Sequence, residues 1–172
     1  PHAFLERTVR LLGLDNVTVS ESALGDRRGS GQMSLPMRRG LPVHGRAFLA
    51  DEADGPGPNA EFRTERRLPV TVSTLDTVVR AAGLDRVDLV KIDVEGYEPA
   101  VLRGAEWTLD EYRPTLLLEI EARHLAKFGV APATLVGALA ARGYDMAALW
   151  DGRWRRVDGI VPERRNYLFT PR

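Results

Sequence analysis

Residues 87–99 are Val87-Asp88-Leu89-Val90-Lys91-Ile92-Asp93-Val94-Glu95-Gly96-Tyr97-Glu98-Pro99. The apolar run that ends at Ile92 is rich in β-branched residues and too short for a buried helix, so it predicts a central parallel strand. Gly96 lets the backbone turn, and Pro99 suits the first turn of a helix. The stretch therefore predicts strand, acidic turn and helix, the repeating unit of an α/β fold.

Two carboxylates follow this predicted strand at its carboxyl end. In open α/β sheets ligands bind outside the carboxyl ends of the strands, which makes Asp93 and Glu95 candidate catalytic residues. Acidic residues at such turns also cap helices or favour the positive helix N-terminus, and we expect Glu98 to do so. The spacing alone leaves both roles open for Asp93 and Glu95.

A second predicted strand carries a further carboxylate. Residues 115–120 are Thr-Leu-Leu-Leu-Glu-Ile, with Glu119 near the carboxyl end. Burying an unpaired charge is costly, so Glu119 must be paired or functional. We expect strands 87–93 and 115–120 to be adjacent, parallel and buried on both faces, with Asp93 and Glu119 at neighbouring strand ends.

The composition indicates one globular domain over residues 1–172, because 44% of the residues are hydrophobic and 28% are charged. The 24 basic and 24 acidic residues cancel, so no large field favours nucleic acid or a membrane as partner. The absence of cysteine excludes disulfides and is compatible with a reducing compartment. No signal peptide or membrane span is apparent, and we expect a cytoplasmic protein.

The remaining pattern predicts further strands near residues 16–20, 68–72, 144–150 and 165–170, and helices over 2–12 and 134–142. Asp151-Gly152 is a strong signal for a two-residue hairpin turn. Residues 27–67 hold many glycines and prolines and are expected to form an irregular insertion or lid.

Several of these segments together resemble the FkbM family of S-adenosylmethionine-dependent methyltransferases. The segments are residues 72–79, 91–98 (Lys-Ile-Asp-Val-Glu-Gly-Tyr-Glu), 117–120 and 166–169. The resemblance implies a Rossmann-like class I sheet of mostly parallel strands, with the last strand antiparallel and paired with its predecessor. Family members begin with a strand and a glycine-rich turn that this sequence lacks. The resemblance therefore implies an N-terminally truncated domain, missing the first two strands, in which residues 16–26 correspond to the third.

The resemblance also implies an activity, namely O-methylation of a hydroxyl on a sugar or secondary metabolite, with S-adenosylmethionine as cofactor. It places Asp93, Glu95 and Glu119 in catalysis, and it places the cofactor beside Ser22, Ala23, Asp26 and Asp93. His124 is a second candidate base, although a position on a helix surface is the simpler expectation for it. We assign no metal site, and the alternative is a divalent cation held by Asp93 and Glu119.

A non-enzymatic alternative follows from the missing segments. A truncated α/β module, or one half of a split protein, would need a partner segment at the open sheet edge. An exposed edge carries unpaired backbone groups, so self-association is expected there.

Overall fold

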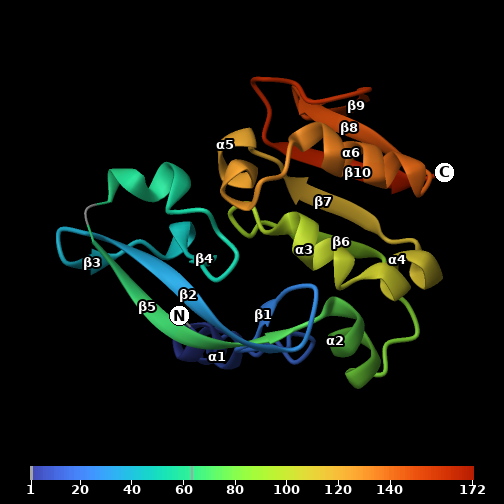
Figure 1. The fold of residues 1–172 in the computed structure, drawn as a ribbon. Helices are drawn as coiled ribbons and strands as arrows, with labels where there is room; N and C mark the ends of the chain where they lie inside the picture. Colours follow the sequence, from blue (N-terminus) through green and yellow to red (C-terminus); the bar gives the residue numbers. More distant parts are fainter. Residues whose placement is uncertain (1, 63) are drawn as a thin grey trace.

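The computed structural model describes residues 2–62 and 64–172 as a mixed α/β fold with two five-stranded sheets (Figure 1). One sheet has the strand order β6-β7-β10-β8-β9, and the other has the order β1-β5-β2-β3, with β4 paired to β2. The first sheet carries the acidic turn of Asp93 and Glu95. The second sheet forms a long extension away from the first.

The first sheet contains β6 (Leu89–Ile92), β7 (Thr115–Glu119), β10 (Asn166–Pro171), β8 (Tyr144–Trp150) and β9 (Arg153–Arg156). Strands β6 and β7 are adjacent and parallel, as predicted, with Ile92 opposite Leu118. Strand β10 lies between β7 and β8 and is antiparallel to both. A mostly parallel sheet is not confirmed, because the pairings in both sheets are mixed.

Helices cover one face of this sheet (Figure 1), and they are α3 (Glu98–Arg103), α4 (Glu106–Tyr112) and α6 (Pro132–Ala141). Leu116 and Leu118 are fully buried beneath them. The residues that alternate with these two on β7 are only half-buried. Leu89 on β6 is 57% exposed. The prediction that both strands are buried on both faces is therefore wrong, because among the described residues helices pack on one face only.

The second sheet contains β1 (Ala23–Leu24), β2 (Gly29–Arg38), β3 (Leu41–Pro42), β4 (Phe48–Leu49) and β5 (Thr64–Ser73). We call residues 29–73 the arm, which includes the short helices η1 (His44–Arg46) and η2 (Gly57–Glu61). Residues 27–67 were expected to be irregular. Apart from residue 63, which lies outside the described residues, this expectation is wrong, because the range includes β2 and the start of β5. Strand β2 contains two glycines and one proline, which are unusual in strands, yet it pairs with β5 from Gly29 to Met37.

Of the other expected strands and helices, some form where predicted and some do not. No strand forms at residues 16–20; β1 lies slightly later and pairs two residues with β5. The expected strand 68–72 lies within β5, and the hairpin forms at Asp151 and Gly152, both of which have positive φ. Helix α1 (His2–Leu11) forms, but it buries none of its residues and Phe4 is 76% exposed.

Two shorter helices, α5 (Ala122–Leu125) and η3 (Ala126–Phe128), follow β7 directly. In the described part of the chain no single helix is long and apolar enough to cross a membrane. Residues 122–128 and 132–141 reach that length and composition only as a pair bent by 88°.

Candidate active site

The acidic turn after β6 is held by a buried carboxylate. Glu98 Oε1 accepts hydrogen bonds from the backbone N–H groups of Val94 (3.1 Å) and Gly96 (3.2 Å). Glu98 is 1% exposed, and burial raises its pKa. Glu98 lies in the first turn of α3, as expected, but its carboxylate fixes the shape of the turn before the helix and does not cap the helix.

Gly96 allows the turn to pass against α5. Its φ is +104°, and a Cβ placed there would lie 2.3 Å from the carbonyl oxygen of His124. Only glycine tolerates both the backbone conformation and the close approach. The neighbouring Glu95 also has a positive φ of 57°, so two consecutive residues bring its carboxylate toward α5.

Asp93 and Glu119 meet at the ends of β6 and β7 and have opposite protonation preferences. A salt bridge with Lys91 Nζ at 2.8 Å is the main cause that lowers the pKa of Asp93. Burial, followed by the negative charge of Asp93, raises the pKa of Glu119 to about 7. Each carboxyl group shifts the pKa of the other, so Glu119 takes up a proton more readily while Asp93 stays ionised.

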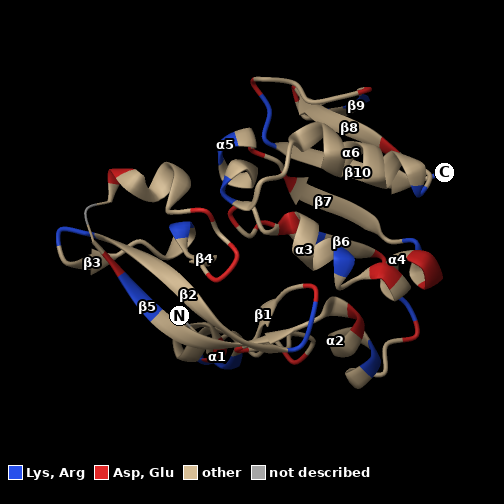
Figure 2. Ribbon diagram, viewed as in Figure 1, with Lys and Arg blue, Asp and Glu red and all other residues tan. Residues whose placement is uncertain are grey.

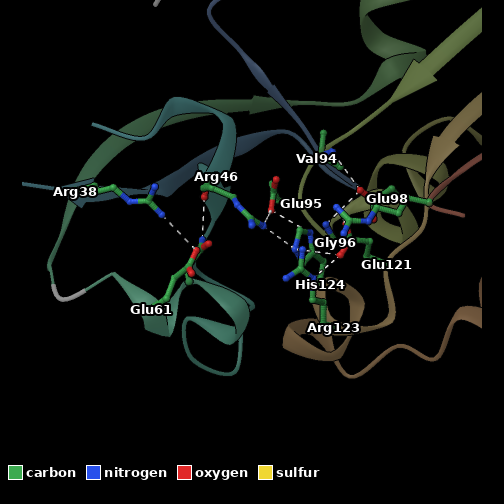
Figure 3. A network of polar contacts seen from close by, with 12 residues as sticks. Arg38, Arg46, Glu61, Val94, Glu95, Gly96, Glu98, Glu121, Arg123 and His124 are labelled. Atoms are coloured by element: carbon green, nitrogen blue, oxygen red, sulfur yellow. Dashed lines mark hydrogen bonds and ion pairs between the residues drawn. The ribbon is translucent and has the colours of Figure 1, made fainter. Parts of the chain in front are cut away.

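Glu95 and His124 face each other beside this pair (Figure 3). His124 Nδ1 lies 3.0 Å from Glu95 Oε2, yet the atoms are not aligned as a hydrogen bond, and Oε2 is buried without a hydrogen-bond partner among the described residues. His124 is 3% exposed, and burial lowers its pKa to about 4. The expected helix-surface position of His124 is therefore wrong.

Arg46 reaches this group from the arm (Figure 3). Its Nη1 lies 3.0 Å from His124 Nε2 and 3.6 Å from Glu95 Oε2. A guanidinium group can only donate, so Nε2 must accept and the proton of the neutral imidazole is assigned to Nδ1. Asn59 Nδ2 donates to the backbone oxygen of Arg46 at 2.9 Å, which fixes the other end of the residue.

Lys127 is a second cation near this group, and it is buried at the contact between the arm and η3. It is 2% exposed, its Nζ has no hydrogen-bond partner among the described residues, and burial lowers its pKa to about 8. Its Nζ lies 3.8 Å from the centre of the Phe48 ring. The backbone oxygen of Lys127 also accepts a hydrogen bond from Asp54 of the arm.

The charges of this region are therefore mixed, and Figure 2 shows acidic positions where β7 ends beside the basic positions of α5. Glu95, Glu119 and His124 each offer an atom within 4.8 Å of the others, which is close enough to share a cation. The Arg46 guanidinium already supplies positive charge to Glu95 and occupies His124 Nε2. Because Arg46 already compensates the charge of Glu95, we propose no cation there.

Of the four residues predicted at the cofactor, Asp93 lies in the acidic turn, whereas Ser22, Ala23 and Asp26 lie elsewhere, around β1. Ala23 is paired with β5, and the Asp26 carboxylate forms salt bridges with Arg27 (3.1 Å) and Arg103 (3.2 Å). Asp26 lines a cavity of about 50 Å³ together with Glu52 and Tyr97. Tyr97 follows the acidic turn directly and donates to Glu52 at 3.2 Å, so this cavity borders the turn.

Two residues of the site, Arg46 and Lys127, are not selected by any motif in the sequence. Arg46 is one of 24 basic residues and lies in a region that was expected to be irregular. Lys127 carried one usable signal, because it and Lys91 are the only lysines in the sequence.

Comparison with known proteins gives one match. Residues 14–146 match the family model described as "Methyltransferase FkbM domain". No curated protein and no solved structure matches the chain.

Proposed function

The chain belongs to the FkbM methyltransferase family, and from this premise we propose that it transfers a methyl group from S-adenosylmethionine to a hydroxyl of a sugar or secondary metabolite. The observation that supports this proposal best is the Asp93–Glu119 pair. A general base works best when its pKa lies near the working pH, and the pKa of Glu119 is about 7. The proposal also includes the class I arrangement of the sheet, in which β6 and β7 present this pair at their carboxyl ends.

The site has features that suit a positively charged cofactor. Burial is the largest cause of the raised pKa of Glu119, and the charges of Asp93, Glu121 and Glu95 add to it. These carboxylates would stabilise a sulfonium cation placed beside Glu119. Asp26 would face the remainder of the cofactor, with Ser22 and Ala23 beside it. The cavity at Asp26 is about 50 Å³, so these residues would contact one edge of a nucleoside. When bound, S-adenosylmethionine supplies a methyl group on a positively charged sulfur.

In the proposed mechanism, Glu119 takes the proton of the hydroxyl group that is to be methylated. Asp93 remains ionised because of Lys91, and its charge holds the proton on Glu119 after transfer. Placing the hydroxyl beside this base supplies part of the rate through orientation. Burial raises the pKa of Glu95 too, but the charges of Arg46 and Lys127 oppose this rise, so we assign the role of base to Glu119.

His124 and Arg46 act as positioning residues in this scheme. With a pKa of about 4, His124 stays neutral near pH 7 and is a poor base there. Arg46 fixes its tautomer and connects the arm to the acidic turn.

The test is methyl transfer from S-adenosylmethionine labelled in the methyl group to a set of hydroxylated acceptors. We expect label in an ether product, and a loss of about a hundredfold or more in turnover for Glu119→Gln. The matched control is Glu106→Gln, because Glu106 forms only an exposed salt bridge with Arg142. No label in any acceptor would contradict the proposed activity, and an unchanged rate in Glu119→Gln would contradict the assigned base.

A second candidate is a module that completes its sheet with a partner segment. Strand β6 pairs only with β7 among the described residues, and Leu89 beside that free edge is 57% exposed. Methyl transfer that appears only after addition of a partner segment would favour this second candidate.

A further inference from the structure

The arm contains a cavity of about 300 Å³ between β2, β4, η2 and the start of β5. This volume is at the lower end of the range for small-molecule sites, which are mostly apolar with a few placed polar groups. Phe48, Phe62, Pro36 and Pro56 form flat apolar walls. Thr64, Glu65 and Arg67 form a polar side.

The polar side of the arm cavity is preorganised. Ser34 is fully buried in β2, and its Oγ donates to Glu65 Oε2 at 2.5 Å. Arg67 Nε donates to the other oxygen, Oε1, at 2.9 Å. These two hydrogen bonds lower the pKa of Glu65, so the carboxylate stays ionised and fixed in direction. Each carboxylate oxygen has a second acceptor position, so Glu65 can still accept from a ligand.

The charge balance selects among possible ligands. Glu65 and Arg67 neutralise each other, so the cavity has no excess charge to attract a cation or an anion. It offers acceptors from Glu65, donors from Arg67 and Thr64, and apolar surface from two phenylalanines, each of which has a cation over one face of its ring. This set matches a neutral ring that has hydroxyl groups on its edge and C–H groups on its face.

The arm cavity also shares its inner wall with the candidate active site. Phe48 lines the cavity and lies against Lys127. Asn59, which is 4% exposed, lines the cavity and holds the backbone of Arg46. A ligand in the cavity is therefore separated from His124 and Glu95 by one layer of side chains.

We propose that the arm cavity binds a neutral hydroxylated ring of the pyranose type, with a ring face on Phe62 and hydroxyl groups bonded to Glu65. That this ring is a non-reacting part of the methyl acceptor rests on the proposed function. Binding energy from such a remote group can contribute to catalysis by positioning the reacting hydroxyl.

Saturation-transfer NMR on the whole chain with methyl α-glucopyranoside as probe, and glycerol as a ring-free polyol control, tests the proposal. We expect saturation of the ring protons of the glucoside and none for glycerol. Phe62→Ala and Glu65→Gln should each raise the dissociation constant about tenfold. Phe4→Ala, in the exposed face of α1, should leave it unchanged.

No saturation of the glucoside by the native protein would overturn the proposal, as would unchanged binding in both cavity variants. Phe62 is only half-buried, so Phe62→Ala keeps the test valid if Glu65→Gln fails to fold. The two proposals fail in distinguishable ways. Glucoside binding without methyl transfer to any acceptor would contradict only the proposed function. Methyl transfer with a KM unaffected by Phe62→Ala would contradict only the proposed binding of the acceptor's ring in the arm cavity.

Discussion

The amine of Lys127 is buried without a hydrogen-bond partner among the described residues. Burying its charge costs folding free energy, and this cost depends on pH. The folded-state pKa of about 8 lies below the ordinary value of 10.5, so the cost is fully present below pH 8 and disappears as the pH rises above 10.5. We expect Lys127→Met to raise the free energy of unfolding by about 1 kcal/mol at pH 7. In denaturant unfolding, the stability difference between Lys127→Met and the native protein should shrink as the pH rises, because the native Lys127 then loses its buried charge.

Lys91→Met is the matched control, since the Lys91 side chain is 53% exposed. It should change stability little and show no such dependence on pH. A destabilised Lys127→Met variant would instead mean that the contact with Phe48 outweighs the desolvation of the amine.

Arg46 can be tested through His124. The charge of Arg46 lowers the pKa of His124, so Arg46→Met should raise that pKa and release the imidazole from one tautomer. NMR titration of the ring nitrogens measures both effects. Arg38→Met is the control, because Arg38 lies in the same arm over Phe62, away from His124. A His124 titration identical in native protein and Arg46→Met would contradict the contact.

At the residue scale, the sequence selects the three carboxylates and His124 as candidates, but not Arg46 or Lys127. Asp93 and Glu95 follow a recognisable strand, and Glu119 ends one. Arg46 and Lys127 join the site only through contacts of the arm with α5 and η3, and no local pattern encodes those contacts.

The acidic turn is the element on which the site depends. Gly96→Ala combines a left-handed backbone with a clash against α5, and we expect it to lower the free energy of unfolding by about 3 kcal/mol. Gly129→Ala separates the two causes, because Gly129 has a φ of +65° and a Cβ added there would meet nothing within 4 Å. It should cost about 1 kcal/mol. Equal losses in thermal unfolding of the two variants would show that the contact with α5 is unimportant.

Elements were predictable where local signals agree. Strands β6, β7, β8 and β10 follow apolar runs, and Asp151-Gly152 fixes the hairpin between β8 and β9. Strand β2 was missed because Gly29, Gly31 and Pro36 disfavour a strand locally. Its pairing with β5 stabilises it from a distance in the sequence.

At the scale of the whole molecule, the free edge of β6 is the most exposed apolar feature of the first sheet. We propose that the chain self-associates through this edge, because unpaired strand edges offer backbone groups to other chains. Sedimentation velocity should show concentration-dependent association that Leu89→Lys weakens. Leu41→Lys is the control, since Leu41 is 71% exposed in the arm. A monomer at every concentration would contradict this proposal.

The order of the strands could not be read from the residues themselves. The position of β10 between β7 and β8 depends on contacts between segments far apart in the chain. The family resemblance supplied the expectation that the last strand is antiparallel and paired with its predecessor. Strand β10 is antiparallel, but it pairs with β7 and β8 and not with β9, the strand before it in the chain. The resemblance did not supply the arm, which now connects a candidate ligand cavity to the acidic turn.

The pH dependence of methyl transfer by the native protein and by Asp93→Asn shows whether Glu119 is the base. If Glu119 is the base, the native rate should rise with pH through an apparent pKa near 7. The charge of Asp93 raises the pKa of Glu119, so Asp93→Asn should move this limb to lower pH whatever its absolute rate. A rate that rises over the same pH range in both proteins, or a native rate independent of pH, would contradict the assignment of Glu119 as the base.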